Sequence, residues 1–229
     1  MADNLSIIIK KMEEILINNK DMINKECAFA VLVMIHTGIR VGNEKSANGY
    51  ICNVKSNKEQ YKKEIKTFGL TTLLKEHIRF KDENLFLEFV GKKGIEQKIE
   101  IKSSLLKNWA SYFFNTNREK WLGINVSQLN TFIKKKIGKY HIKDFRTLKA
   151  CLEAGLIAKK INDNPKPKNK RTFSSEIKQI CESVSKDLGN TPGICKKSYI
   201  NPEIFEWLAL ERFPQWLEPV IKKKKVIKK

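Results

Sequence analysis

Residues that bind metals or form disulfides are scarce in this chain of 229 residues. It has five cysteines, an odd number, and no two of them are spaced as Cys-x-x-Cys. It has only three histidines and no acidic cluster of the Asp-x-Asp kind. Zinc and calcium sites need such clusters, so the sequence predicts reduced thiols and chemistry that runs without a metal. The residues concerned are Cys27, Cys52, Cys151, Cys181, Cys195, His36, His77 and His141.

Long apolar runs are missing as well. No stretch reaches the roughly eighteen apolar residues that span a bilayer, and the chain does not begin with a signal-peptide pattern. Acidic residues are few, since 25 Asp and Glu stand against 45 Lys and Arg, which gives a net charge of +20. This imbalance is typical of proteins that bind a polyanion. We therefore expect an intracellular protein whose partner is nucleic acid, not a membrane.

Apolar residues at helical spacing predict that most of the chain is α-helical. Residues 4–18 and 27–35 form two leading helices, and Gly38 suits the position after the second. Residues 42–66 have no sustained period and predict a loop with short helical pieces. Further helices are predicted at 103–113, 129–137, 143–160, from Ser174 or Ser175 to Leu188, and from Pro202 to Arg212.

Two segments are strongly basic. Residues 162–171 contain two prolines and four positive charges, which predict an exposed linker. Residues 222–229 are mostly lysine and predict a disordered tail. Both are most simply solvated segments with weak affinity for DNA.

Three segments have the composition of β-structure, at 68–73, 85–90 and 95–101. The sequence Gly-Lys-Lys-Gly at 91–94 predicts a hairpin turn between the last two. We expect its two glycines to supply the positive φ of a tight turn, with Lys92 and Lys93 projecting from the tip. The predicted fold is therefore mainly α with a small three-stranded antiparallel sheet, an α+β class.

Tyr199 ends the stretch GNTPGICKKSY and is the candidate nucleophile. A phenol with a pKa of about 10 is a poor nucleophile at neutral pH, so other groups must hold the atom it attacks. Taken alone, Tyr199 could be an ordinary packing residue. Arg40 could neutralise the dipole at the C-terminus of the helix before it, and Arg146 could form an ion pair with Asp144 or Glu153 on its own helix. Those readings do not explain why the candidates occur together. The candidate partners of the tyrosine are Arg40, Lys92 or Lys93, Arg146 and Asn190.

Five motifs follow one another in a recognisable order. They are TGIRVGNE at 37–44, FGLTTL at 68–73, FVGK at 89–92, IKDFRT at 142–147, and GNTP leading to KKSY at 189–199. Their order resembles the catalytic domain of type IB DNA topoisomerases, especially the poxviral and bacterial branch, from about Thr37 to about Pro202. Any one motif is weak evidence, whereas five in order make chance agreement improbable. The resemblance implies the topoisomerase IB and tyrosine recombinase-like catalytic fold.

The resemblance also implies an activity on duplex DNA. One strand is cleaved through a 3′-phosphotyrosyl intermediate and resealed, which relaxes supercoils without ATP or another cofactor. Tyr199 is the implied nucleophile, while Arg40, Arg146 and Asn190 hold the nonbridging oxygens. Lys92 is the implied general acid for the 5′-oxygen, and the sequence leaves Lys93 open for that role. By the same resemblance, DNA contacts are expected from Lys93, Lys143, Thr71, Lys75, His77, Lys196 and Lys197.

We interpret residues 1–221 as one catalytic domain, with residues 1–38 as leading helices and 222–229 as the tail. Members of this family carry a β-containing half-clamp before the catalytic domain, and only 39 residues precede Arg40 here. The half-clamp is therefore expected to be absent, in either a catalytic fragment or a minimal enzyme. We expect a monomer that acts with DNA, in a bacterial cytoplasm or nucleoid or in a viral setting.

Three alternatives remain at this level. A tyrosine recombinase shares the Arg, Lys, Arg and Tyr chemistry but usually has His-x-x-Arg at the second arginine. Here KDFR stands at that place, with His141 five residues before Arg146. A non-catalytic basic DNA-binding module and an RNA-binding protein both fit the charge, but neither accounts for the ordered motifs.

Overall fold

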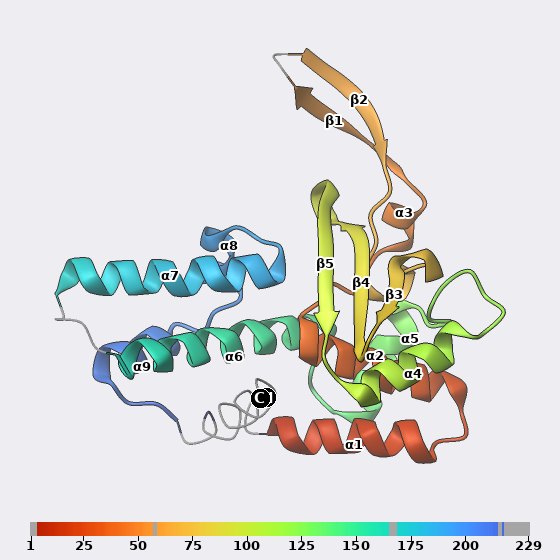
Figure 1. The fold of residues 1–229 in the computed structure, drawn as a ribbon, viewed down its shortest axis with the longest axis horizontal. Coiled ribbons are helices and arrows are strands. Elements are labelled where there is room, and N and C mark those ends of the chain that lie inside the picture. The colour runs from red at the N-terminus through yellow and green to blue at the C-terminus, as the bar shows by residue number, and fades with distance from the viewer. Residues whose placement is uncertain (1–3, 57–58, 165–168, 215–216, 218–229) are drawn as a thin grey trace. The chain divides into compact units, whose positions relative to one another are not determined.

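The structure is a computed structural model that describes residues 4–56, 59–164, 169–214 and 217. The chain divides into two compact units. We call Ile9–Ile142 the central unit, and Lys143–Lys229 together with Met1–Ile8 the C-terminal unit. Helices dominate, and the described strands form two small antiparallel sheets, so the predicted α+β class is confirmed (Figure 1).

The core of the central unit is built around helix α2 (Met22–Thr37). Nine consecutive residues of this helix, Cys27–Ile35, are 6% exposed or less, as their continuous apolar run predicts. The Phe29 ring lies 5.2 Å from Phe113 and 5.3 Å from Trp121. Helix α2 ends at Gly38, whose φ of 66° confirms the predicted cap. The other long helices of this unit are α4 (Ser104–Phe114), α5 (Val126–Lys136) and the part of α1 (Leu5–Asn18) that begins at Ile9.

A three-stranded sheet is present in the central unit, with two of its strands where they were predicted and a third, β3 (Ile78–Lys81), where no strand was predicted. It has the order β3, β4 (Asn84–Gly91), β5 (Ile95–Ile101), and all pairs are antiparallel. Burial alternates along β4, so one face of the sheet packs on the core. The strand predicted at 68–73 was wrong. That segment contains the 3₁₀ turn η2 (Leu70–Thr72), because the Thr72 hydroxyl accepts the Gly69 N–H at 3.0 Å and closes the turn.

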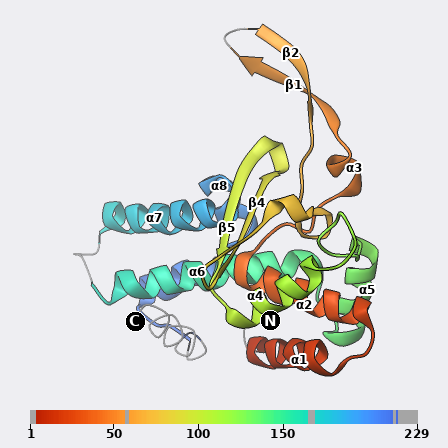
Figure 2. The same cartoon turned by 45° about the vertical axis from the view of Figure 1, so that its right-hand side comes forward.

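The loop predicted at 42–66 is also corrected. Among its described residues the helical piece is α3 (Glu44–Ala47), which is followed by β1 (Tyr50–Ser56) and β2 (Glu59–Ile65). These two strands pair in antiparallel register, from Tyr50 opposite Ile65 to Ser56 opposite Glu59. In Figures 1 and 2 this ribbon extends away from the rest of the central unit, beyond the lysine end of the three-stranded sheet. Ile51 of β1 is 70% exposed, and Lys62, Lys63 and Glu64 of β2 are exposed as well. Apolar alternation marks a half-buried strand, so these described positions give no such signal.

The C-terminal unit packs α6 (Ile142–Asn162) against α7 (Lys170–Leu188) and α9 (Glu203–Leu210). The short helix α8 (Pro192–Ser198) lies between α7 and α9 in the chain. Small residues of α6 at every fourth position allow the close packing that this core needs. The core consists of Ala150, Ala154, Ala158, Ile180, Cys181, Val184, Leu188, Cys195, Ile200, Ile204 and Leu208.

Helix α7 begins earlier than predicted. Its cap is Asn169, whose side-chain oxygen accepts the N–H groups of Arg171 and Thr172 at 2.9 Å, so neither Ser174 nor Ser175 is the cap. The basic linker predicted at 162–171 is therefore shorter, since its ends belong to α6 and α7. Its centre at 165–168 and the tail at 222–229 lie outside the described residues.

Candidate active site

Tyr199 is placed by a short capped helix. The Thr191 hydroxyl accepts the Ile194 N–H at 3.3 Å, and Pro192 occupies the first turn of α8. At the other end, the Tyr199 N–H donates to the Cys195 carbonyl at 3.1 Å, and Cys195 is fully buried. The motif GNTP therefore begins the helix that presents Tyr199, which is half-buried.

Arg146 of α6 lies directly beside this tyrosine. Its guanidinium carbon is 5.3 Å from the centre of the Tyr199 ring, within the range of a cation–π contact. The Arg146 side chain is only 7% exposed, and its Nη2 donates to the carbonyl oxygen of Leu188. A buried guanidinium and the candidate nucleophile thus come together in one unit, from positions 53 residues apart (199 − 146).

The contact with Leu188 also places Asn190. Leu188 is the last residue of α7, and Gly189 with a φ of 56° turns the chain so that the Asn190 N–H donates to Ser185 at 3.0 Å. Asn190 is half-buried and follows Leu188 by two residues. The C-terminal unit therefore gathers three of the predicted site residues around the end of α7.

One residue of this group was not predicted. The Cys151 thiol donates to the backbone carbonyl of Tyr199 at 3.3 Å and accepts the Asn201 N–H at 3.4 Å. Burial raises the pKa of this thiol above its ordinary value, so it remains a protonated donor at neutral pH. Nothing in the local sequence around Cys151 signals this contact, which joins residues 48 positions apart.

Arg40 lies in the central unit, and the motif FGLTTL supports its backbone. The Leu70 N–H donates to the Arg40 carbonyl at 2.8 Å. The N–H and hydroxyl of Thr71 both donate to the Val41 carbonyl, at 2.8 Å and 2.9 Å. Gly69 is required by close approach, because a Cβ there would lie 2.6 Å from the Arg40 carbonyl oxygen. The motifs TGIRVGNE and FGLTTL, which are separate in sequence, are therefore joined through their backbones.

Lys92 and Lys93 are exposed at the turn between β4 and β5. The two glycines do not play equal parts in this turn. Gly91 is extended with φ of −90°, whereas Lys93 and Gly94 have φ of 68° and 74°. The Phe68 N–H donates to the Val90 carbonyl at 2.8 Å, so the segment that supports Arg40 also joins the strand that ends at Lys92.

Three predicted DNA-contact residues are engaged inside the central unit. Thr71 is 1% exposed, and the Lys75 ammonium donates to the Thr116 carbonyl. The Nδ1 atom of His77 accepts the Leu74 N–H at 3.0 Å, and its ring lies 4.4 Å from the Phe68 ring. Burial lowers the pKa of His77 below its ordinary value. The exposed members of the predicted set are Lys93, Lys143, Lys196 and Lys197.

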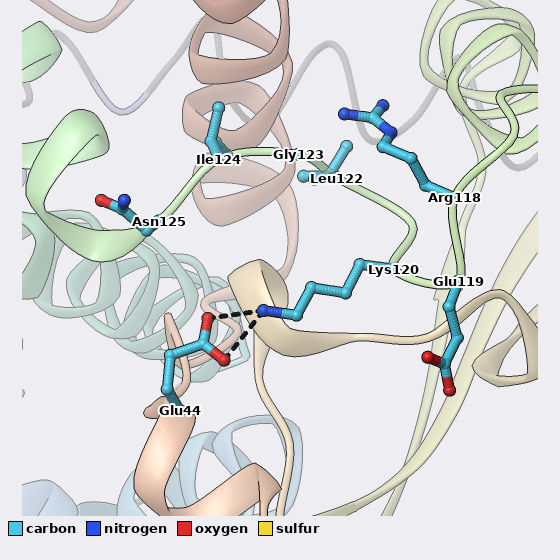
Figure 3. A pocket seen from close by; sticks show the side chains of 8 residues that line it. All are labelled: Glu44, Arg118, Glu119, Lys120, Leu122, Gly123, Ile124 and Asn125. Carbon is cyan, nitrogen blue, oxygen red and sulfur yellow. Dashed lines mark hydrogen bonds and ion pairs between the residues drawn. The ribbon is translucent and has the colours of Figure 1, made fainter.

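A hollow of about 600 Å³ lies elsewhere on the central unit and is lined by Glu44 and by residues 118–120 and 122–125 (Figure 3). Glu44, the last residue of the motif TGIRVGNE, is bound there by Lys120 Nζ at 2.8 Å to both carboxylate oxygens. The buried carboxylate of Glu26 accepts from Arg118 at 2.6 Å and from the Gly123 N–H at 2.5 Å. The Lys120–Glu44 pair fixes the segment after Arg40 to residues 118–125, and Glu26 fixes the same residues to α2. The hollow contains none of the predicted catalytic residues.

In the part of the chain that the structure describes, no cluster of three or more His, Cys, Asp or Glu residues forms a metal site. The described helices are likewise too short or too polar to cross a membrane.

The predicted catalytic residues fall into two groups. Arg40 and Lys92 belong to the central unit, and Arg146, Asn190 and Tyr199 belong to the C-terminal unit. Within the C-terminal unit the structure brings Arg146 and Tyr199 into contact. Within the central unit, hydrogen bonds through residues 68–71 connect the backbone of Arg40 to β4.

Comparison with known proteins places the chain in a family. Residues 1–201 match the model of the eukaryotic DNA topoisomerase I catalytic core. The chain is 28% identical over 180 residues to DNA topoisomerase 1B of Acanthamoeba polyphaga mimivirus, covering 67% of this chain and 53% of the relative. It is 27% identical over 164 residues to DNA topoisomerase 1B of Vaccinia virus (strain Copenhagen), covering 70% and 51%.

DNA topoisomerase 1 of Rabbit fibroma virus (strain Kasza) is also 27% identical, over 160 residues, covering 68% of this chain and 50% of that protein. The chain thus spans about half the length of the relatives it matches. The family model, in contrast, covers most of the chain, including every candidate catalytic residue from Arg40 to Tyr199. The chain therefore belongs to the family of the DNA topoisomerase I catalytic core, that of the type IB topoisomerases.

Proposed function

We propose that this chain is the catalytic domain of a type IB DNA topoisomerase, which relaxes supercoiled duplex DNA without ATP. The observation that carries the proposal is the contact between the buried guanidinium of Arg146 and the ring of Tyr199. The family match supports a topoisomerase over a tyrosine recombinase or a non-catalytic DNA-binding module. We further propose that the domain acts as a monomer inside the cell, where its DNA substrate lies.

The proposed reaction is a transesterification at a backbone phosphorus. The Tyr199 hydroxyl oxygen forms a bond to phosphorus and loses its proton to water, while the bond to the 5′-oxygen breaks. Lys92 gives its proton to that 5′-oxygen, which leaves as a hydroxyl and not as an alkoxide. Religation reverses both proton transfers and restores the phosphodiester bond. The bond energy stays in the phosphotyrosyl link, so no cofactor is required.

The transition state carries extra negative charge on the nonbridging oxygens. Arg40 and Arg146 are assigned to this charge, because a planar guanidinium can donate two parallel hydrogen bonds to phosphate. Asn190 is assigned to one nonbridging oxygen, to which its amide donates without adding charge. Burial of Arg146 strengthens its electrostatic effect, since water screens it less.

The DNA contacts are proposed from the exposed lysines, namely Lys93, Lys143, Lys196 and Lys197. Thr71 donates to the Val41 carbonyl next to Arg40, the His77 ring packs on Phe68, and Lys75 donates to Thr116. We propose that these three residues support the fold of the central unit and act on DNA binding only indirectly.

The test is incubation of the protein with supercoiled plasmid in EDTA without ATP, stopped with detergent. We expect relaxed topoisomers and a covalent DNA adduct on Tyr199. Tyr199→Phe removes the attacking oxygen and should abolish both products while leaving DNA affinity unchanged. Relaxation by Tyr199→Phe, or a wild-type protein that yields neither product, would refute the proposal.

A further inference from the structure

The β1–β2 ribbon has no role in the function proposed so far. Each of its strands is seven residues long, and among the described residues each pairs only with the other. A lone two-stranded hairpin is marginally stable in water and normally needs a surface to cover it. The ribbon nonetheless extends from the central unit in both views (Figures 1 and 2).

The base of the ribbon is tied to the candidate catalytic segments. The Thr67 N–H donates to Ser46 at 2.9 Å and closes the two ends of the ribbon on each other. The next residue, Phe68, donates its N–H to Val90, two residues before Lys92. The ribbon thus begins and ends on the backbone that supports Arg40 and β4. DNA that is bound by those segments would therefore contact the ribbon.

The charge of the ribbon matches a polyanion. Residues 50–66 contain five lysines and two glutamates, a net charge of +3 (5 − 2). Lys62, Lys63 and Lys66 are exposed in the half of the ribbon near its base. Lysine on an edge strand also discourages the addition of a further strand, which argues against another protein chain as the covering surface.

The size of the ribbon matches duplex DNA. Seven residues at about 3.3 Å each give a length of about 23 Å. The major groove is about 12 Å wide and admits a two-stranded β-ribbon. The ribbon is therefore long enough to cross the groove and to contact phosphates on both of its sides.

We propose that the β1–β2 ribbon is a DNA-binding arm that enters the major groove of duplex DNA. Lys62 and Lys63 are neighbours in β2, so their side chains leave opposite faces of the ribbon and can contact phosphates on the two sides of the groove. The inference rests on the proposed function for the identity of the duplex, but not on the chemistry of Tyr199. Lys62 and Lys63 supply affinity by releasing counterions from the DNA, so their contribution depends on salt concentration.

The test compares Lys62→Ala/Lys63→Ala with Lys134→Ala/Lys135→Ala, which removes the same charge from exposed positions on α5. Affinity for a short duplex is measured by fluorescence anisotropy between about 50 mM and about 200 mM salt. Loss of two phosphate contacts should lower the slope of log K against log salt by about 1.8. The ratio of wild-type to variant affinity should therefore be about tenfold larger at about 50 mM than at about 200 mM salt. The α5 variant should keep the wild-type slope. An equal loss in both variants, or none in the ribbon variant, would overturn the proposal.

A second variant tests the ribbon as a whole. Ile51 and Glu64 are directly opposed, so residues 52–63 can be replaced by Asn-Gly, which forms a two-residue hairpin turn. Thermal unfolding verifies that the variant is folded. We expect its hydroxyl-radical footprint on duplex DNA to lose a block of protected sugars, and an unchanged footprint would contradict the proposal.

The wild-type covalent adduct is measured in parallel, which separates the two proposals. Adduct formation with no effect of the ribbon variants rejects the arm alone. Ribbon-dependent binding without an adduct supports the arm and rejects the proposed chemistry.

Discussion

The thiol of Cys151 on α6 donates a hydrogen bond of 3.3 Å to the backbone carbonyl of Tyr199. The same sulfur accepts the N–H of Asn201, so one side chain holds the chain on both sides of Ile200. Both hydrogen bonds are to backbone atoms, so we regard Cys151 as a positioning residue for the candidate nucleophile.

Cys151→Ala should therefore slow cleavage without weakening DNA binding. A hydrogen bond of this kind contributes about 1 kcal/mol, which corresponds to roughly a fivefold lower rate if it orients Tyr199. Cys151→Ser keeps a donor and an acceptor at the same place and should recover most of the rate. Single-turnover cleavage of a suicide duplex, with Kd measured separately, distinguishes this result from loss of stability. Equal rates for the alanine and serine variants would show that the hydrogen bonds do not matter.

Arg146→Ala should affect both cleavage and folding. The substitution removes the cation beside Tyr199 and leaves the Leu188 carbonyl without this donor. Loss of one preorganised donor to transition-state charge typically costs about 10²–10³ in rate, and loss of a buried hydrogen bond costs about 1–3 kcal/mol of stability. Urea unfolding and adduct formation measure the two effects. Arg171→Ala, an exposed arginine on α7, is the control and should change neither.

The general acid can be assigned between Lys92 and Lys93 by changing the leaving group. An alkoxide needs a proton to leave, whereas a thiolate at the 5′-position leaves without one. If Lys92 is the acid, Lys92→Ala should cleave a normal duplex very slowly and a 5′-phosphorothiolate duplex near the wild-type rate. Lys93→Ala should respond equally to both substrates, because a phosphate contact is insensitive to the leaving atom. The opposite pattern would assign the role to Lys93.

Stability of the protein should fall as the medium becomes acidic because of His77. Burial lowers the pKa of this imidazole in the folded state, so the unfolded chain binds a proton more readily. The stabilisation is present above the ordinary pKa of about 6.5 and is lost as the pH falls through the lowered value. Protonation would also remove the Nδ1 acceptor used by Leu74. Urea unfolding at several pH values should show a flatter dependence for His77→Asn, and the wild-type dependence for His141→Asn, which changes an exposed histidine.

Sequence periodicity was sufficient for the long helices, because their apolar stripes are local signals. It failed for the β1–β2 ribbon, whose two strands are held by backbone pairing with each other and leave Ile51 70% exposed. It also failed at 68–73, where the turn depends on the Thr72 hydroxyl and on hydrogen bonds to Arg40 and Val41, 30 residues earlier. Because these hydrogen bonds join segments that are far apart in the chain, they produce no periodic pattern in the sequence.

The candidate site was predictable in its residue types but not in its supports. The structure brings two of the predicted site residues, Arg146 and Tyr199, into contact. Cys151 and the ion pair between Lys120 and Glu44 were missed, because each joins segments that are far apart in the chain. A sequence pattern can predict which charged groups belong to a site. The residues that position those groups are identified only from the contacts in the folded structure.

Gly69→Ala tests whether such a support controls the candidate site. Gly69 has an extended backbone with φ of −161°, so alanine causes no dihedral strain there. The added Cβ would instead lie 2.6 Å from the Arg40 carbonyl oxygen, and backbone must move to make room. Overpacking of this kind costs about 1–3 kcal/mol of stability and displaces Arg40. We expect adduct formation to fall further in Gly69→Ala than in Arg40→Lys, which keeps the positive charge and leaves the backbone in place. Gly193→Ala, where nothing lies within 4 Å of the new Cβ, should leave cleavage unchanged. Normal cleavage by Gly69→Ala would mean that Arg40 does not depend on this backbone contact.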